Sequence, residues 1–191
     1  MSALLEAASL SKTFFSEHNA LPAVCNVSFS VAPGECLGLA GASGCGKSTL
    51  ARLLMGLTPA DSGTVSFNGQ PLDFSDDSLR LNYYSQVQLV FQNAAAAFLP
   101  RKSIGISIML PMLNYGYTRA AAQERSIALL LAAGLTPQHA EKFPHQLSGG
   151  ECQRAAIARA ISSKPRLLIC DEITSALDVQ TQAEIIQLLL D

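Results

Sequence analysis

Residues 41–49 read Gly-Ala-Ser-Gly-Cys-Gly-Lys-Ser-Thr, which fits the pattern G-x-x-x-x-G-K-[ST]. They stand between a short apolar run at 36–40 and a run with helical periodicity at 50–57. This order of strand, loop and helix lets glycines curl the backbone, so that successive N–H groups point inward at the positive end of the helix. The pattern predicts a nucleoside triphosphate site built from Gly41, Ala42, Ser43, Gly44, Cys45, Gly46, Lys47, Ser48 and Thr49. The alternative is a flexible turn rich in glycine and serine.

The side chains of this loop have separate predicted roles. Lys47 would reach the β- and γ-phosphates, and the hydroxyl of Ser48 would bind Mg²⁺. A phosphate chain carries several negative charges and must be held without burying an unpaired anion. The loop therefore predicts ATP-like binding with Mg²⁺.

Length and charge narrow the remaining function classes. The chain has 191 residues, which suits a single domain over 1–191 with a good core. Its 13 basic and 15 acidic residues give a net charge of −2, so we predict neither a nucleic-acid groove nor a polybasic membrane anchor. The longest apolar run, 127–135, is nine residues, whereas a bilayer span needs about 20. We expect a cytosolic chain whose mean hydropathy of +0.25 fits docking onto other subunits.

The order of apolar runs predicts an α/β fold. Strands are expected at 4–10, 24–31, 36–40, 87–91 and 166–170, and an edge hairpin at 64–67 with the turn Asn68-Gly69. Residues 101–146 are rich in Ala and Leu and predict a helical insert, broken at Pro111, Gly134, Pro137 and Pro144. A further helix is expected at 179–191.

A second motif, Leu-Ser-Gly-Gly-Glu-Cys-Gln-Arg at 147–154, precedes a helical run. Ser148 and Glu151 fit the S-x-x-E capping box, and capping alone is one interpretation. Gly149 and Gly150 make a poor helix start by propensity, but they make sense if a phosphate approaches the backbone closely.

A third motif is the apolar run at 166–170, which ends in Asp171-Glu172. At the carboxyl end of a strand, Asp171 can hold Mg²⁺ through water, and Glu172 can polarise an attacking water. The alternative is a carboxylate pair at a solvated strand end.

Together and in this order, the three motifs resemble the nucleotide-binding domain of ATP-binding-cassette (ABC) transporters. Residues 41–49 resemble the Walker A loop, 147–154 the family signature, and 167–172 the Walker B strand with its glutamate. The resemblance runs from about Leu4 to the last residue. It implies a P-loop NTPase fold of ABC type: a mostly parallel core sheet, an N-terminal antiparallel β subdomain and a helical signature subdomain at about 101–162.

The resemblance also assigns expected roles to single residues. Phe14 stands where an aromatic ring stacks on adenine, and Gln92 stands where the family's Q-loop glutamine follows a strand. The implied Mg²⁺ ligands are Ser48, Gln92 and Asp171, and the implied catalytic residues are Glu172 and Gln92. Ser148, Gly149 and Gly150 would cover the γ-phosphate held by a second ATP-binding subunit. Residues 175–178 would also contact that subunit.

Within the family, the stretch from Gln92 to Phe98-Leu-Pro-Arg101 and residues 44–52 resemble importers of dipeptides, oligopeptides and nickel. Such importers pair two ATP-binding subunits under membrane permeases, which receive substrate from a binding protein. The resemblance implies a peripheral subunit on the cytoplasmic face of the inner membrane, which couples ATP binding and hydrolysis to import of peptides or nickel. The helical insert and the Q-loop would take up a coupling helix of the permease.

Two departures from the family pattern stand out. Glu151 replaces the more usual Gln, a polar exchange that we expect to be tolerated. The three histidines, His18, His139 and His145, all precede the Walker B-like strand, whereas the family has a switch histidine after it. We therefore expect a C-terminally truncated cassette. A truncated, non-catalytic ATP-binding or regulatory module is the alternative, and a soluble ABC ATPase of translation or DNA repair is a more distant one.

Overall fold

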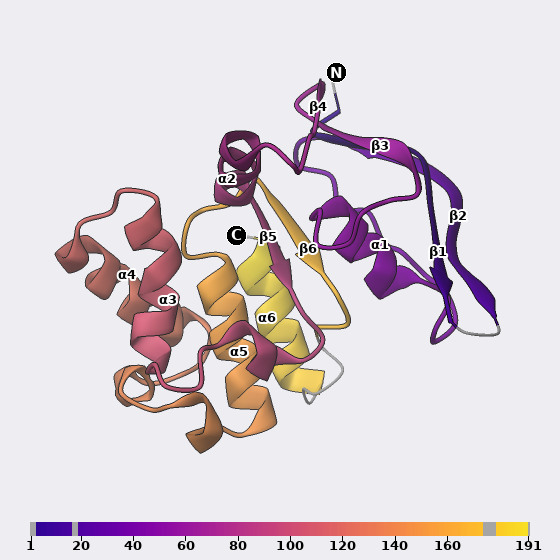
Figure 1. Ribbon diagram of the computed structural model, residues 1–191. Coiled ribbons are helices and arrows are strands. Elements are labelled where there is room, and N and C mark those ends of the chain that lie inside the picture. Colours follow the sequence, from indigo (N-terminus) through magenta and orange to yellow (C-terminus); the bar gives the residue numbers. More distant parts are fainter. Residues whose placement is uncertain (1–2, 17–18, 174–178, 191) are drawn as a thin grey trace. The chain divides into compact units, whose positions relative to one another are not determined.

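The computed structural model describes residues 3–16, 19–173 and 179–190 (Figure 1). It divides the chain into two compact units, Met1–Tyr84 and Ser85–Asp191. Each unit has its own secondary structure. The single domain over 1–191, with a helical subdomain at 101–162, stays a prediction.

The first unit contains an antiparallel sheet of four strands in the order β2-β1-β3-β4. The strands are β1 (Leu5–Phe15), β2 (Ala20–Val31), β3 (Ser62–Phe67) and β4 (Gln70–Pro71). Leu5 pairs with Val31 on one side and with Phe67 on the other, and all three side chains are buried. The predicted N-terminal antiparallel β region is confirmed, and both of its long strands extend beyond the predicted bounds.

The predicted edge hairpin is also present. Ser66 pairs with Pro71 and Phe67 with Gln70 across the Asn68-Gly69 turn. Asn68 has φ 52° and Gly69 has φ 75°. Positive φ at both central residues is what a type I′ turn requires, and Asn-Gly is the sequence that adopts it most readily.

Two helices join this unit, α1 (Lys47–Leu54) and the first part of α2 (Asp77–Gln86), whose last two residues belong to the second unit. The hydroxyl of buried Tyr83 on α2 donates to the Leu54 carbonyl oxygen at 3.0 Å. Its ring meets Phe67 edge-on, with centroids 5.3 Å apart. Tyr83 therefore ties both helices to the sheet. The sequence patterns did not predict α2, although Asp76 caps it by accepting from the Leu79 N–H.

The predicted strand at 36–40 is wrong. This segment has no regular secondary structure, and Leu37 and Leu39 are 41% and 49% exposed. A strand exists only where a neighbour completes its hydrogen-bond ladder, and within the described ranges none pairs with these residues. A short apolar run predicts that its residues tend to be buried, but it does not predict which strand would pair with them.

In the second unit, β5 (Val87–Val90) and β6 (Leu167–Cys170) pair in parallel. The register runs from Val87 opposite Leu167 to Val90 opposite Cys170. Helices α5 (Gly149–Ala160) and α6 (Val179–Leu190) lie beside this pair (Figure 1). A buried cluster joins them: Val90, Ile157, Ala160, Ile173 and Ile185. Both predicted strands and the predicted last helix are confirmed.

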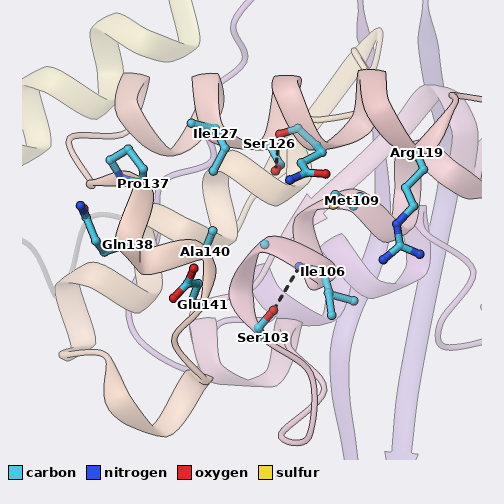
Figure 2. Close-up of a pocket in the computed structure, with 12 residues that line it drawn as sticks. Ser103, Ile106, Met109, Arg119, Ser126, Ile127, Pro137, Gln138, Ala140 and Glu141 are labelled. Carbon is cyan, nitrogen blue, oxygen red and sulfur yellow. Dashed lines mark hydrogen bonds between the residues drawn. The ribbon is translucent and has the colours of Figure 1, made fainter.

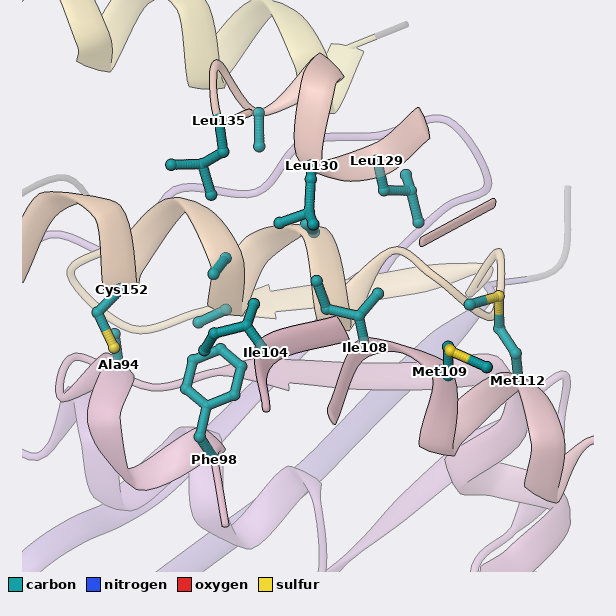
Figure 3. Packing of buried hydrophobic residues seen from close by; sticks show 14 of the residues in the cluster. Ala94, Phe98, Ile104, Ile108, Met109, Met112, Leu129, Leu130, Leu135 and Cys152 are labelled. Carbon is teal, nitrogen blue, oxygen red and sulfur yellow. The ribbon is translucent and has the colours of Figure 1, made fainter. Parts of the chain in front are cut away.

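The rest of the second unit is helical, as predicted for the insert. Its elements are η1 (Ala94–Ala97), α3 (Ile104–Asn114), α4 (Arg119–Ala132), η2 (Pro137–Ala140) and η3 (Pro144–Gln146). Figure 3 shows the buried core of this region, in which Ile104, Ile108 and Met112 of α3 are fully buried with Leu130 of α4. The four-residue spacing of the α3 side chains gives that helix one continuous apolar face.

Pro111 corrects another prediction, because it lies inside α3 and does not end it. A helical proline loses one backbone hydrogen bond and normally kinks or breaks the helix. Here Ile108 and Met112, on either side of Pro111, are fully buried in the core. Burial of these side chains stabilises the helix by more than the missing hydrogen bond destabilises it.

Gly134 does end α4, as predicted. Its N–H donates to the Leu131 carbonyl and the Leu135 N–H donates to the Leu130 carbonyl, a Schellman pair made possible by φ 69° at the glycine. None of the helices in the described part of the chain combines the length and apolar character needed to cross a bilayer.

Candidate functional site

The phosphate loop in the first unit ends at the N-terminus of α1. Gly46 caps the helix in the left-handed conformation with φ 100°, and Gly44 also has positive φ, 79°. A Cβ on Gly46 would lie 2.0 Å from the Ala23 carbonyl oxygen, so no other residue fits there. The loop thus adopts left-handed backbone conformations that glycine favours, and it ends at the N-terminus of α1, the positive end of the helix dipole.

Lys47 folds back over this loop. Its Nζ donates to the carbonyl oxygens of Gly41 at 2.9 Å and Ala42 at 3.0 Å. Residues 41–45 are exposed and Lys47 is half-buried, so the loop itself is open to solvent. Phosphate oxygens are stronger acceptors for an ammonium than neutral carbonyls are. The loop therefore fits a polyphosphate, with Lys47 already on it.

Phe14 lies near the end of β1, where its ring is 43% exposed. The Nζ of Lys12 lies 5.8 Å from the ring centroid, within the range of a cation–π contact. Lys12 is itself held by Asp61 at 2.7 Å. An exposed, partly fixed ring is a suitable stacking surface, and the adenine contact of Phe14 stays a prediction.

In the second unit, the parallel register brings together two residues that are 80 positions apart. Gln92 follows β5 and Glu172 follows β6, and Gln92 Nε2 donates to Glu172 Oε2 at 2.6 Å. Between them, the Asp171 N–H donates to the Val90 carbonyl oxygen at 3.0 Å. Glu172 has φ 50°, a conformation that a side chain other than glycine rarely adopts. Such backbone strain is concentrated at functional sites.

The signature motif forms the start of α5. Ser148 caps the helix: its Oγ accepts from the Glu151 N–H at 3.3 Å, and Glu151 Oε2 accepts from the Ser148 N–H at 2.8 Å. The predicted capping box is confirmed. Among the described residues, nothing lies within 4 Å of the position that a Cβ on Gly149 would occupy. Packing within that part of the chain therefore does not require a glycine at this position, and the phosphate contact of Gly149 stays a prediction.

The sequence profile of the ABC transporter family matches residues 24–175. The chain belongs to this family. It is 44% identical over 170 residues to the glutathione import ATP-binding protein GsiA of Pectobacterium atrosepticum, covering 88% of this chain and 27% of that protein. It is 42% identical over 178 residues to the oligopeptide transport ATP-binding protein OppF of Haemophilus influenzae, covering 92% and 54%. The chain therefore spans about half, or less, of the length of these curated relatives.

Solved ABC structures resemble the fold closely. One is the dimeric ATP-binding cassette MJ0796 in a post-hydrolysis state with ADP and Pi, with a TM-score of 0.88 and 30% identity. The match covers 97% of this chain and 81% of that one. The predicted fold class, a P-loop fold of ABC type, is confirmed.

The two units of this ABC chain hold different parts of the predicted site. The first holds Phe14 and the Walker A loop, and the second holds Gln92, Asp171, Glu172 and the signature. Within the second unit, the structure brings Gln92 and Glu172 into contact. Residues 175–178, expected to contact a second subunit, lie outside the described residues.

His139 belongs to none of the sequence motifs, yet it contacts the signature. Its Nε2 lies 3.1 Å from Glu151 Oε1, and its Nδ1 lies 2.9 Å from Thr136 Oγ1. Hydrogen bonds from the Ser148 N–H and from His139 lower the pKa of Glu151 from 4.5 to about 2. No periodic pattern links residues 139 and 151, so only the packing of η2 onto the insert reveals the contact.

The helical insert also contains a cavity of about 520 Å³ between α3, α4 and η2. Figure 2 shows Ile106, Met109, Arg119 and Glu141 among the residues that line it. The lining therefore combines apolar side chains with the charged side chains of Arg119 and Glu141. Ile106 is 42% exposed. None of the predicted nucleotide-site residues lines this cavity.

Proposed function

We propose that this chain is an ATP-binding subunit that couples ATP binding and hydrolysis to import of peptides through a membrane permease. The relatives reported above are named for glutathione and oligopeptide import, which supports peptides over nickel as cargo. The same names favour an importer over a soluble ABC ATPase of translation or DNA repair. The chain would act as a peripheral subunit on the cytoplasmic face of the inner membrane.

The contact between Gln92 and Glu172 carries the hydrolytic part of this proposal. Both residues are expected to act in hydrolysis, and Gln92 Nε2 lies 2.6 Å from Glu172 Oε2 although the residues are 80 positions apart in sequence. Glu172 would accept a proton from the attacking water and so polarise it. Gln92, which donates to this carboxylate, would orient it.

The remaining site residues would bind and position the nucleotide. The loop at residues 41–49 would hold the β- and γ-phosphates through backbone N–H groups and Lys47, and Phe14 would stack on adenine. Ser48, Gln92 and Asp171 offer the oxygen ligands that Mg²⁺ prefers. When bound, Mg²⁺ would neutralise part of the negative charge of the phosphates.

A second ATP-binding subunit, identical or not, would complete the site. The solved relative MJ0796 is a dimer. In the chain described here, Ser148, Gly149 and Gly150 would cover the partner's γ-phosphate, and the open space at Gly149 supports this role.

The helical insert would contact the permease, and through it the chain would act together with a substrate-binding protein. The cavity between α3, α4 and η2 supports this assignment, because exposed Ile106 at a cavity is a suitable anchor for an apolar helix.

Steady-state ATP hydrolysis by the purified chain tests the proposal. The parent should hydrolyse MgATP, Glu172→Gln should bind it with hydrolysis reduced by two orders of magnitude or more, and exposed Glu141→Gln should match the parent. MgATP binding without hydrolysis in the parent would favour the alternative of a non-catalytic module. Normal hydrolysis by Glu172→Gln would contradict the role of that residue.

A further inference from the structure

His139 is a buried polar side chain with no assigned role, and it touches the residue at which this signature departs from the family pattern. It is only 9% exposed, on η2, which packs against α3 and α4. Its ring connects Thr136 at one nitrogen to Glu151 at the other. Glu151 in turn holds the backbone of Ser148.

We propose that His139 is a positioning residue: it fixes the Glu151 carboxylate and thereby holds the turn at Ser148, Gly149 and Gly150 in shape to receive a phosphate. The first part, the fixing of the turn, stands on the geometry of the second unit alone. The second part, the phosphate, rests on the proposed function.

The hydrogen bonds define which ring nitrogen carries the proton in neutral His139. The backbone N–H of Thr136 donates to Nδ1 at 3.1 Å. The Thr136 carbonyl oxygen also lies 3.3 Å from Nδ1, so the contacts at Nδ1 alone allow either tautomer. The Glu151 carboxylate at Nε2 can only accept, which places the proton of the neutral ring on Nε2 and leaves Nδ1 to accept from the Thr136 N–H. Nε2–H is then the donor that faces Glu151 Oε1 at 3.1 Å. The Glu151 carboxylate thus selects the tautomer, and the Thr136 N–H is matched to it.

The two oxygens of Glu151 serve two different donors. Oε1 faces His139 and Oε2 accepts from the Ser148 N–H at 2.8 Å. A glutamine at this position would place an NH₂ donor opposite one of these two donors. The carboxylate is therefore the matched partner for His139 and Ser148 together. With one oxygen held by a shielded histidine, the other has less freedom to leave the Ser148 backbone.

The tautomer is tested by ¹⁵N NMR of the histidine rings in the parent chain at pH 8, with His18→Gln and His145→Gln to assign the signals of the three histidines. We expect His139 to show a protonated Nε2 and an unprotonated Nδ1. A protonated Nδ1 in neutral His139 would overturn the proposal, because that ring could not donate to Glu151.

The positioning is tested by hydrogen exchange of the Ser148 amide. His139→Leu should speed exchange about tenfold, the effect expected when the anchor of a charge-assisted hydrogen bond is lost. His139→Gln keeps a donor of similar reach and should restore most of the protection. The control is His145→Leu, since His145 is exposed and stacks on Phe143, and it should leave the exchange unchanged.

If His139→Leu fails to fold, Glu151→Gln provides the second measurement. It should also speed Ser148 exchange and should shift the ¹⁵N signal of His139 Nε2. Unchanged Ser148 exchange in both variants would overturn the proposal.

The phosphate part has a separate readout. His139→Leu should weaken MgATP-driven dimerisation about tenfold in sedimentation experiments, while the affinity of the monomer for MgATP stays within twofold. Altered exchange with normal dimerisation would confirm that His139 positions the turn and refute the proposed role of the signature. Normal exchange would refute the positioning itself, whatever the dimerisation.

Discussion

At single residues, the phosphate loop shows how strongly backbone geometry restricts the choice of amino acid. Gly46 sits at φ 100° with a carbonyl oxygen where its Cβ would be, so an alanine there would have to displace β2 or the loop. Lys47 is the next residue, and its ammonium already lies on the loop carbonyls. The backbone thus sets the position of the charge that the loop presents.

Replacing that charge gives the first prediction. Lys47→Ala removes the ammonium group and should weaken MgATP binding at least tenfold, because charge-assisted hydrogen bonds contribute about 1.5–3 kcal/mol. Isothermal titration of the purified chain measures this affinity. Arg52→Ala is the matched control, since Arg52 is an exposed cation in the last turn of the same helix. Equal affinities for the parent and Lys47→Ala would contradict the loop assignment.

Among the elements, α5 combines a strong capping box with a weak first turn. Ser148 and Glu151 hold its N-terminus through two reciprocal hydrogen bonds. Gly149 and Gly150 follow directly, where alanine would suit a helix better. The two glycines therefore lower the intrinsic stability of the first turn of α5, and the hydrogen bonds of the capping box offset this effect.

The capping carboxylate predicts a pH dependence of stability. The pKa of Glu151 is about 2 in the folded chain, below its ordinary 4.5. Its stabilising contribution is therefore complete above about pH 4.5 and is lost as the pH falls toward 2. Urea unfolding at pH 6, 4 and 3 should show the parent more stable than Glu151→Gln at pH 6, with the difference shrinking at the lower values. A difference that stays constant over this range would refute the assignment.

The glycine at the helix start predicts opposite effects on stability and function. Gly149→Ala should stabilise the chain by roughly 0.5 kcal/mol, since its Cβ meets no atom of the residues that the structure describes and alanine favours the helix. It should nevertheless impair MgATP-driven dimerisation. Gly105→Ala is the contrast: its Cβ would lie 3.0 Å from Ala140, so it should destabilise the chain. Loss of stability in Gly149→Ala would mean that packing requires this glycine.

At the scale of the whole molecule, the family relationship predicts an assembly. Each unit of the chain carries a part of the proposed site, and the signature is proposed to act on the nucleotide of a second subunit. Dimerisation should therefore depend on bound ATP and reverse on hydrolysis.

Glu172→Gln should keep ATP bound and so accumulate the dimer. Sedimentation velocity with MgATP should then show a species of twice the 20.2 kDa monomer mass. The parent should revert to monomer as the ATP is hydrolysed, and Glu172→Gln combined with Lys47→Ala should stay monomeric. A monomeric Glu172→Gln chain at saturating MgATP would count against self-association, and would leave a non-identical partner as the form to test.

The sequence by itself determined the features that depend on nearby residues. The Asn68-Gly69 turn, the glycine that ends α4 and the capping box of α5 all follow from local backbone chemistry, so their patterns predicted them. The three ABC motifs are equally local, because each is a short loop joined to one helix or strand. The roles of Phe14, Gln92 and the Mg²⁺ ligands stay predictions.

Tertiary structure decided whatever depends on partners distant in sequence. Apolar residues at 36–40 form no strand, and within the described ranges no strand pairs with them. Pro111 stays inside α3 because side chains on both sides of it are buried in the core. The register of β5 and β6 brought Gln92 to Glu172, and the packing of η2 brought His139 to Glu151. Such contacts depend on the free energy of packing whole elements together, which no local pattern of residues records.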